Sequence, residues 1–223
     1  MKIHLASATL ADIRWAVDHG LADGVVTSPG LLAAERSGDG ASRELLEEIS
    51  RAVALPVTVS VAAVDPSDIH RDGRELAKLG DNIVVQVPFV DDAVVAIRRL
   101  TDDGVRVAAT LIFSAAQALL AAKSGAQTVT VPIDQLDGLG QDSMVVVQEI
   151  RKLFDRGDVE CDVMTSYPRS AAEFTACGLH GADAVTIGLP TMRELLVHPL
   201  TDRGVDHFLR DISARPRPRI QPV

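Results

Sequence analysis

Short runs rich in valine and isoleucine alternate eight times with longer segments of helical periodicity along this chain. A parallel strand is buried on both faces, so it reads as such a run, and a helix then carries the chain back to the start of the next strand. Eight βα units close into a barrel whose binding site lies at the carboxyl ends of the strands. The pattern predicts an α/β fold, a (β/α)8 TIM barrel with an additional C-terminal helix. The predicted strands cover residues 2–7, 24–27, 56–61, 82–87, 105–110, 127–132, 160–165 and 183–187.

Capping residues indicate where several helices begin. Thr9, Asp65 and Ser114 each precede a segment whose first turn suits a helix N-terminus. Thr201 predicts the start of the last helix in the same way. The glycines expected to end helices are Gly20, Gly80, Gly104, Gly125 and Gly178.

The length and composition favour one domain. The chain has 223 residues, of which 47% are hydrophobic, and this is enough for one substantial core. No interdomain linker is visible, so we expect a single domain over residues 1–213. Proline alternates with arginine from position 215 to 219, which cannot continue a helix. We therefore expect an extended Pro/Arg-rich tail over residues 214–223.

Charge and cysteine content limit the partners of the chain. The formal net charge of −9 argues against nucleic acid or an anionic membrane surface, because both need a basic face. No apolar run approaches the roughly 18 residues that a membrane span needs. Cys161 and Cys177 form neither a metal-ligand spacing nor a disulfide framework. The sequence thus predicts a protein of the reduced cytoplasm with no metal and no cofactor.

Five short blocks carry a resemblance that covers nearly the whole chain. In their order and spacing they resemble the small transaldolases and fructose-6-phosphate aldolases, a TIM-barrel family. Each block is degenerate by itself, and the assignment depends on all of them together. The blocks are GVVTSP at 24–29, NIVVQVPF at 82–89, TLIFSAAQALL at 110–120, LDGLGQD at 136–142 and HPLTDRG at 198–204.

Gln86 departs from the pattern of that family at its central residue. The family motif in the fourth strand is close to Asn-Ile-Val-Val-Lys-Val-Pro, and its lysine forms a Schiff base with a ketose. A primary amide cannot do this chemistry. The chain has four lysines, of which Lys2 falls at the bottom of the first strand and Lys78, Lys123 and Lys152 fall on helical patterns. We therefore expect no aldolase chemistry through a lysine imine.

Strand parity predicts the residues around Gln86. Successive side chains of a strand point to opposite faces, so an inward Gln86 fixes its own strand, and the family guides the register of the others. The resulting substrate-binding candidates are Gln86, Ser28, Ser60, Thr110, Thr130 and Ser166. Ala6 is also inward, where the resemblance implies an aspartate. A buried ammonium that lost its carboxylate would cost about 3–5 kcal/mol, so the joint absence of both groups is physically consistent.

Recognition of phosphate looks weakened in the same region. Gln135 stands where the resemblance implies an arginine, and the loop after the seventh predicted strand is short. Arg169 remains as a candidate for substrate binding, together with helix N-termini. Because glutamine cannot replace the two oriented donors of a guanidinium, the ligand is expected to be unphosphorylated or to be held by Arg169.

Four residues are candidates for acid–base catalysis. Asp134 and Asp137 follow the sixth predicted strand, where either could act as a base or could simply cap the next helix. His4 is inward by parity and is either a proton shuttle or a core histidine. Tyr167 is the only tyrosine of the chain and lies at the predicted mouth, as a donor or as part of a lid.

Three functions remain open from the sequence. The first is an enzyme of carbohydrate metabolism or specialised biosynthesis that acts on a sugar or polyol-type carbonyl compound without a Schiff base. The second is a non-catalytic ligand-binding or scaffold protein, and the third is a true transaldolase with an unrecognised amine. The resemblance also implies a homo-oligomer, a pentamer or decamer, assembled through residues 198–212.

Overall fold

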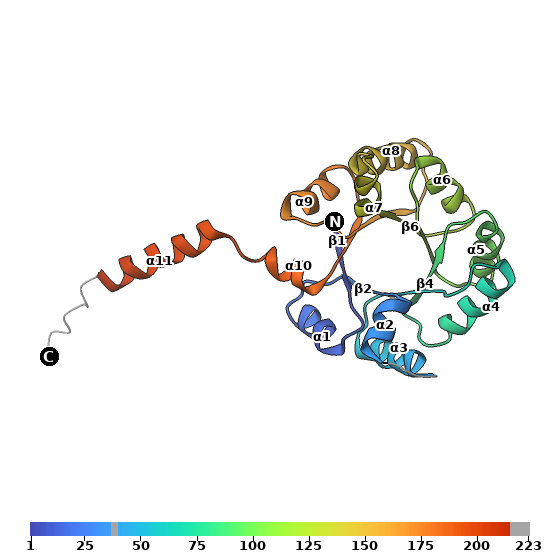
Figure 1. The fold of residues 1–223 in the computed structure, drawn as a ribbon, viewed down its shortest axis with the longest axis horizontal. Helices are drawn as coiled ribbons and strands as arrows, with labels where there is room; N and C mark the ends of the chain where they lie inside the picture. The colour runs from blue at the N-terminus through green and yellow to red at the C-terminus, as the bar shows by residue number, and fades with distance from the viewer. Residues whose placement is uncertain (37–39, 215–223) are drawn as a thin grey trace, which may run out of the picture. The chain divides into compact units, whose positions relative to one another are not determined.

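The computed structural model describes residues 1–36 and 40–214. Eight parallel strands form a closed barrel in chain order, and helices surround it (Figure 1). This confirms the predicted (β/α)8 fold, and each strand lies within about two residues of its prediction. The strands are β1 Lys2–Ala6, β2 Gly24–Thr27, β3 Val57–Ser60, β4 Ile83–Pro88, β5 Val107–Thr110, β6 Thr128–Pro132, β7 Asp162–Ser166 and β8 Ala184–Ile187.

The helices that follow the strands pack on the outside of the barrel. Outward strand residues such as Val85, Val107 and Val163 are fully buried beneath them. Burial of each such side chain stabilises the fold by about 1.5–3 kcal/mol. The helices of this layer are α1 Leu10–Asp18, α2 Pro29–Glu35, α3 Ala41–Ala52, α4 Pro66–Ala77, α5 Ala93–Asp102, α6 Ala115–Lys123, α7 Ile133–Gly138, α8 Ser143–Arg156 and α9 Ala171–Leu179.

Two of the four predicted capping side chains bond to their helices. The Asp65 carboxylate accepts hydrogen bonds from the first turn of α4, and the Ser114 hydroxyl accepts one from the first turn of α6. Thr9 precedes α1 without such a bond, because its hydroxyl donates to Glu35 at 2.9 Å instead. Thr9 therefore bonds to a side chain of α2 and not to the backbone of α1.

The predicted helix ends at glycine are partly wrong. Gly20, Gly104 and Gly125 have positive φ just after helices, as expected. Gly178 instead lies inside α9, and Gly181 takes the left-handed conformation with φ of 100°. A Cβ atom at Gly181 would lie 2.6 Å from Cγ of Arg151, so this position also requires the absence of a side chain.

The chain is divided into two compact units, Met1–Leu189 and Pro190–Val223. The first contains the barrel. The second contains all of α10 Leu189–Glu194 except its first residue, and α11 Pro199–Ala214, which begins two residues before the predicted start at Thr201. The single domain over 1–213 stays a prediction, and the predicted tail lies outside the described residues from position 215 onward.

Helix α11 carries five exposed apolar side chains. Phe208 is 63% exposed and Leu209 is 54% exposed. Leu200, Val205 and Ile212 are exposed to a similar degree. Solvated single apolar residues are common, but five on one helix of 16 residues are typical of a surface that another element covers.

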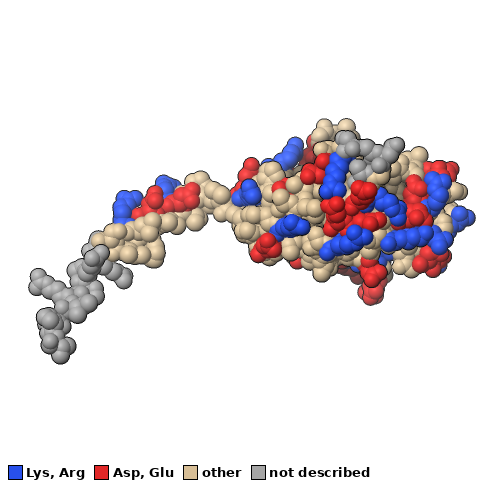
Figure 2. Space-filling model, turned by 90° about the horizontal axis from the view of Figure 1, so that it is seen from below, with Lys and Arg blue, Asp and Glu red and all other residues tan. Residues whose placement is uncertain are grey.

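Charges of both signs are mixed over the face of the first unit that Figure 2 shows. On α3 and α4 several arginines pair with nearby carboxylates, as Arg51 does with Glu47 at 2.9 Å and Arg71 with Asp68 at 2.7 Å. None of the helices in the described part of the chain has the length and apolar character needed to cross a membrane.

Candidate functional site

A small cavity lies at the carboxyl ends of the strands, where a TIM barrel places its site. Its volume is about 70 Å³. Five of the predicted substrate-binding residues and Tyr167 line it together, and no lysine, arginine, aspartate or glutamate of the described residues does. The lining residues are Val26, Thr27, Ser28, Leu31, Gln86, Thr110, Thr130, Ser166, Tyr167 and Thr186.

Gln86 is held in one orientation by its neighbour on β3. The strands pair with Ser60 opposite Gln86, and the Ser60 hydroxyl donates a hydrogen bond of 2.7 Å to Oε1 of Gln86. Gln86 is 7% exposed. The Ser60 hydroxyl uses one of the two lone pairs of this oxygen and fixes the amide, so Gln86 offers a ligand mainly its N–H groups. Ser60 itself does not line the cavity and acts through Gln86.

Two of the lining hydroxyls differ in their availability. Ser28 is the N-cap of α2, and its Oγ accepts a hydrogen bond of 3.2 Å from the backbone N–H of Leu31. Its hydroxyl hydrogen is still free to donate. The Oγ1 atom of Thr130 is buried and has no hydrogen-bond partner. An unsatisfied buried hydroxyl is costly, so Thr130 is a strong candidate to bond a ligand or a water molecule.

Thr186 is a lining residue that the sequence interpretation missed. It lies on β8 directly opposite Ser166 of β7. Its hydroxyl donates to the sulfur of Met164 at 3.1 Å. The parity of the predicted strand 183–187 could have placed it inward, but no block of the resemblance covers this strand.

Tyr167 covers the cavity from the loop after β7. Its φ is 61°, a left-handed conformation that costs a non-glycine residue about 1–2 kcal/mol. The side chain is 46% exposed. Burial of the rest of the ring and the nearby negative charge of Asp134 both raise the pKa of the Tyr167 phenol. The hydroxyl is therefore protonated at neutral pH and can act as a proton donor.

Asp134 lies in the first turn of α7, next to the cavity and not in its lining. Its Oδ1 atom is buried and has no hydrogen-bond partner. This oxygen can still accept a proton or a hydrogen bond, and a carboxylate near a tyrosine is a common feature of acid–base sites. In this arrangement Asp134 influences the cavity through its charge, which acts on Tyr167.

Asp137 and Arg169 bind each other and the ends of helices. Oδ1 of Asp137 accepts a hydrogen bond of 3.1 Å from the backbone N–H of Ser143, the first residue of α8. Its other oxygen lies 3.7 Å from Arg169, which also pairs with Glu173 at 3.5 Å. These are the contacts of helix-capping and surface residues, and neither side chain lines the cavity.

His4 points into the barrel, as parity predicts, but it lines a different cavity at the amino ends of the strands. It is 8% exposed, and burial lowers the pKa of its imidazole. His4 therefore shares no site with Gln86 or Tyr167, and its role as a shuttle in that site is not supported by this arrangement.

The four lysines all lie in the described part of the chain and away from Gln86. Lys2 forms an ion pair of 2.9 Å with Asp162 where β1 and β7 begin. Lys78 follows α4, Lys123 ends α6 and Lys152 lies in α8. Over residues 1–36 and 40–214, no group of three or more His, Cys, Asp or Glu side chains could hold a metal ion.

Comparisons with known proteins identify the family. A family model described as Transaldolase/Fructose-6-phosphate aldolase matches residues 4–217. This chain belongs to that family. A protein named "Probable transaldolase" from Hyphomonas neptunium is 40% identical over 211 residues, covering 95% of this chain and 96% of the relative. Another so named, from Thermoplasma volcanium, is 36% identical and covers 95% of both chains.

A solved structure supports the fold alone. The structure titled "Native KDPGal structure" has a TM-score of 0.59 and 16% sequence identity, and the match covers 83% of this chain and 81% of that one. Two positions at which this chain departs from the motif of the transaldolase/fructose-6-phosphate aldolase family can now be located in the barrel. Gln86 occupies the centre of the cavity region where the family motif implies a lysine, and Ala6 ends β1 where it implies an aspartate.

Proposed function

We propose that this family member acts on the carbonyl group of a sugar or polyol-type compound by acid–base chemistry, without a lysine imine. The observation that carries the proposal is the cavity lining. It offers an oriented amide, several hydroxyls and one phenol, and none of its described residues carries an amine. Such a lining binds and polarises a carbonyl oxygen but cannot form an imine.

Gln86 and Tyr167 have complementary roles in this mechanism. The amide N–H groups of Gln86 donate to the carbonyl oxygen, in the orientation that Ser60 maintains. Tyr167 transfers its phenolic proton to that oxygen as a base removes a proton from the adjacent carbon, which gives an enediol. Asp134, the carboxylate whose charge acts on Tyr167, is the base of this mechanism, and because it lies outside the lining it must come into contact with the substrate to accept the carbon-bound proton. The Tyr167 phenolate then removes the proton of the neighbouring hydroxyl, and Asp134 returns its proton to the original carbonyl carbon, which isomerises the substrate. If Asp134 instead protonates a departing β-hydroxyl, the enediol loses water, and the phenolate takes back an enol proton.

The cavity volume limits what enters it. A water molecule occupies roughly 30 Å³, so about 70 Å³ admits two or three non-hydrogen atoms. This is room for the carbonyl end of a substrate and not for a whole hexose. The rest of the molecule extends outward past Tyr167, whose side chain is half-exposed and must turn aside.

The substrate is proposed to be unphosphorylated. Arg169, the basic residue nearest to the site in the sequence interpretation, is already engaged by Asp137 and Glu173. No described lining residue is cationic. A phosphate would therefore have to displace Asp137 or Glu173 from Arg169 before it could form an ion pair with that residue.

A non-catalytic binding protein is the second candidate. It is favoured by the position of Asp134 behind the lining, since Tyr167 is the only titratable side chain of residues 1–36 and 40–214 that touches the cavity. Hydrogen exchange separates the two candidates. With unphosphorylated sugars in D₂O, an enzyme incorporates deuterium next to the carbonyl group, and Tyr167→Phe abolishes this. Binding without exchange by the unaltered protein would favour the second candidate.

We also propose a homo-oligomer, a pentamer or decamer, assembled through α11, in the cytoplasm. Support comes from the family resemblance over residues 198–212 and from the exposed apolar side chains of that helix. The partner of the barrel site is a small molecule, and no nucleic acid or membrane partner is proposed. A mass measurement in solution tests the assembly.

A further inference from the structure

A second and larger cavity lies at the amino ends of the barrel strands. Its volume is about 450 Å³, several times that of the cavity at Gln86. Three residues in this half of the barrel are small, namely Gly24 on β2, Ala108 on β5 and Ala184 on β8. In most TIM barrels bulky side chains fill these layers, so small residues leave the interior open.

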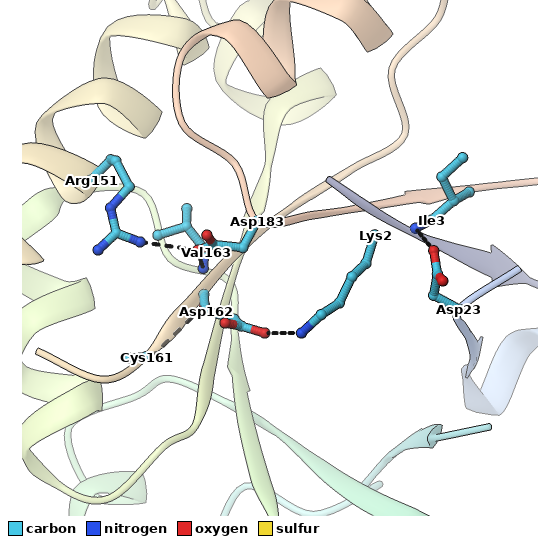
Figure 3. Close-up of polar contacts among 8 residues, drawn as sticks. All are labelled: Lys2, Ile3, Asp23, Arg151, Cys161, Asp162, Val163 and Asp183. Carbon is cyan, nitrogen blue, oxygen red and sulfur yellow. Dashed lines mark hydrogen bonds and ion pairs between the residues drawn. The ribbon is translucent and has the colours of Figure 1, made fainter. Parts of the chain in front are cut away.

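Charged residues form the rim of this cavity and are already paired. Figure 3 shows Lys2 reaching across to Asp162, at 2.9 Å, and Asp23 bound to the backbone N–H of Ile3, at 2.8 Å. The guanidinium of Arg106 donates to the backbone carbonyls of Asp81 and Ile83 at 2.7 Å and 3.2 Å. The rim therefore holds two cations and two anions. Lys2 and Asp162 pair with each other, whereas Arg106 and Asp23 bond to neutral backbone groups. The charges sum to zero, so the rim as a whole favours no net charge on a ligand.

Neutral hydrogen-bonding groups line the interior. His4 is more than nine-tenths buried, and its Nδ1 atom has no hydrogen-bond partner. Its ring occupies the space beside Gly24, where a Cβ atom would lie 2.6 Å from Cε1 of His4. Thr130 is 4% exposed with an unpartnered Oγ1, and it lines both this cavity and the one at Gln86. Thr58 and Thr128 add two further hydroxyls to the lining.

Buried polar atoms without partners need an explanation, because more than nine in ten such atoms are satisfied in folded proteins. Two of them, from β1 and β6, line this one cavity. The apolar part of the wall, which includes Val84 and Met164, suits the carbon side of a bound molecule.

We propose that the amino-terminal cavity binds a small neutral compound rich in hydroxyl groups. The volume would hold about fifteen water molecules at roughly 30 Å³ each, which is ample for a polyol of four to six carbons. Such a molecule offers donors and acceptors to His4 and to the threonines without bringing a charge. This site shares Thr130 with the carbonyl cavity but lies at the other end of the barrel, and it does not depend on the function proposed for that cavity.

The test follows the His4 imidazole by NMR, with its signals assigned by their loss in His4→Asn. Erythritol, a neutral four-carbon polyol, is titrated into the full-length protein, and inorganic phosphate is titrated in parallel. We expect a saturable shift of the His4 signals with erythritol and none with phosphate. The absence of a shift with erythritol, or a saturable shift with phosphate alone, would overturn the proposal.

Two variants that fill the cavity locate the binding. Ala184→Leu should weaken erythritol binding by about tenfold or more, and the milder Ala108→Val should weaken it less. Gln86→Leu, which changes only the other cavity, is the matched control and should leave the His4 response intact. If neither filling variant folds, a crystal of the unaltered protein soaked in erythritol decides. Erythritol bonded to His4 or Thr130 supports the site, and ordered water alone contradicts it.

Discussion

Gln86 has an oxygen that Ser60 occupies and N–H groups that are left for a ligand. Gln86→Leu keeps a side chain of similar size and removes those donors. In the proposed mechanism this should lower the rate of deuterium exchange by about 10²–10³-fold, the usual effect of losing one preorganised donor to a developing oxyanion. Ser60→Ala is the matched variant and should cost less, since it frees the amide without deleting it. Equal activity in Gln86→Leu would contradict the assigned role.

Tyr167 gives a direct test of the electrostatics, because it is the only tyrosine of the chain. Its pKa is raised above the ordinary value of 10.0, first by burial and then by the charge of Asp134. Removing that charge stabilises the phenolate, so Asp134→Asn should lower the pKa of Tyr167 while leaving it above 10.0 through burial. An absorbance titration of the phenolate measures this.

Asp137→Asn is the control for that titration. Asp137 bonds to Ser143 and Arg169 and does not contribute to the pKa of Tyr167. Its substitution should leave the titration midpoint unchanged. A midpoint that moves in Asp137→Asn but not in Asp134→Asn would show that the wrong carboxylate has been placed beside Tyr167.

The absent lysine can be restored with its partner. In Gln86→Lys with Ala6→Asp, both groups that the family resemblance implies return to β4 and β1. A buried ammonium and carboxylate support one another, whereas either one alone is destabilised by several kcal/mol. We expect the double variant to form a reducible imine with a ketose, and Gln86→Lys alone to form less of it and to unfold at a lower temperature. Mass spectrometry after borohydride reduction measures the imine.

At the scale of elements, helix α4 depends on its cap. Asp65 accepts hydrogen bonds from the backbone N–H groups of Ser67 and Asp68 at 2.9 Å and 3.4 Å. Asp65→Ala should lower the free energy of unfolding by about 1 kcal/mol, as loss of such a cap usually does. Thr9→Ala should have a smaller effect, because Thr9 makes no cap bond and its bond to Glu35 is exposed. Urea denaturation of both variants checks the difference.

The strands could be predicted from sequence because their physical signature is local. A parallel strand buried on both faces is a short apolar run, and its alternation carries the inward or outward direction of each side chain. Gln86, Thr110, Thr130 and Ser166 therefore line one cavity as expected. The prediction that Ser60 lines the cavity is wrong, because its hydroxyl bonds to Gln86. Thr186 lines the cavity, and it was not predicted.

Features that depend on packing between distant segments could not be predicted. The volume at Gln86 is set by how Tyr167 and Leu31 close over it, and the helix end near Gly181 is set by Arg151 from another helix. The direction of the Asp134 side chain could not be predicted either. Strand alternation gives directions only within a strand, and Asp134 follows the end of β6. The cavity beside His4 is lined from several strands, with Ala108 on β5 and Ala184 on β8 among its residues, and neither alanine is unusual alone.

At the scale of the whole molecule, α11 carries more exposed large apolar side chains than any other helix of the described residues. Phe208 is 63% exposed in the single chain. If this face is covered by another copy, Phe208→Glu should convert the oligomer into a smaller species, because burying an unpaired carboxylate is strongly unfavourable. Light scattering measures the mass of both proteins. An unaltered protein that is already monomeric would contradict assembly through α11.

The central claim is that chemistry in this barrel proceeds without a lysine imine. Its most direct test is the mass of the intact protein after incubation with fructose or fructose 6-phosphate and reduction with borohydride. We predict no added mass, since none of the four lysines lines the cavity at Gln86, and the Gln86→Lys, Ala6→Asp variant provides the positive control. A reduced ketose attached to any lysine of the unaltered protein would contradict the claim.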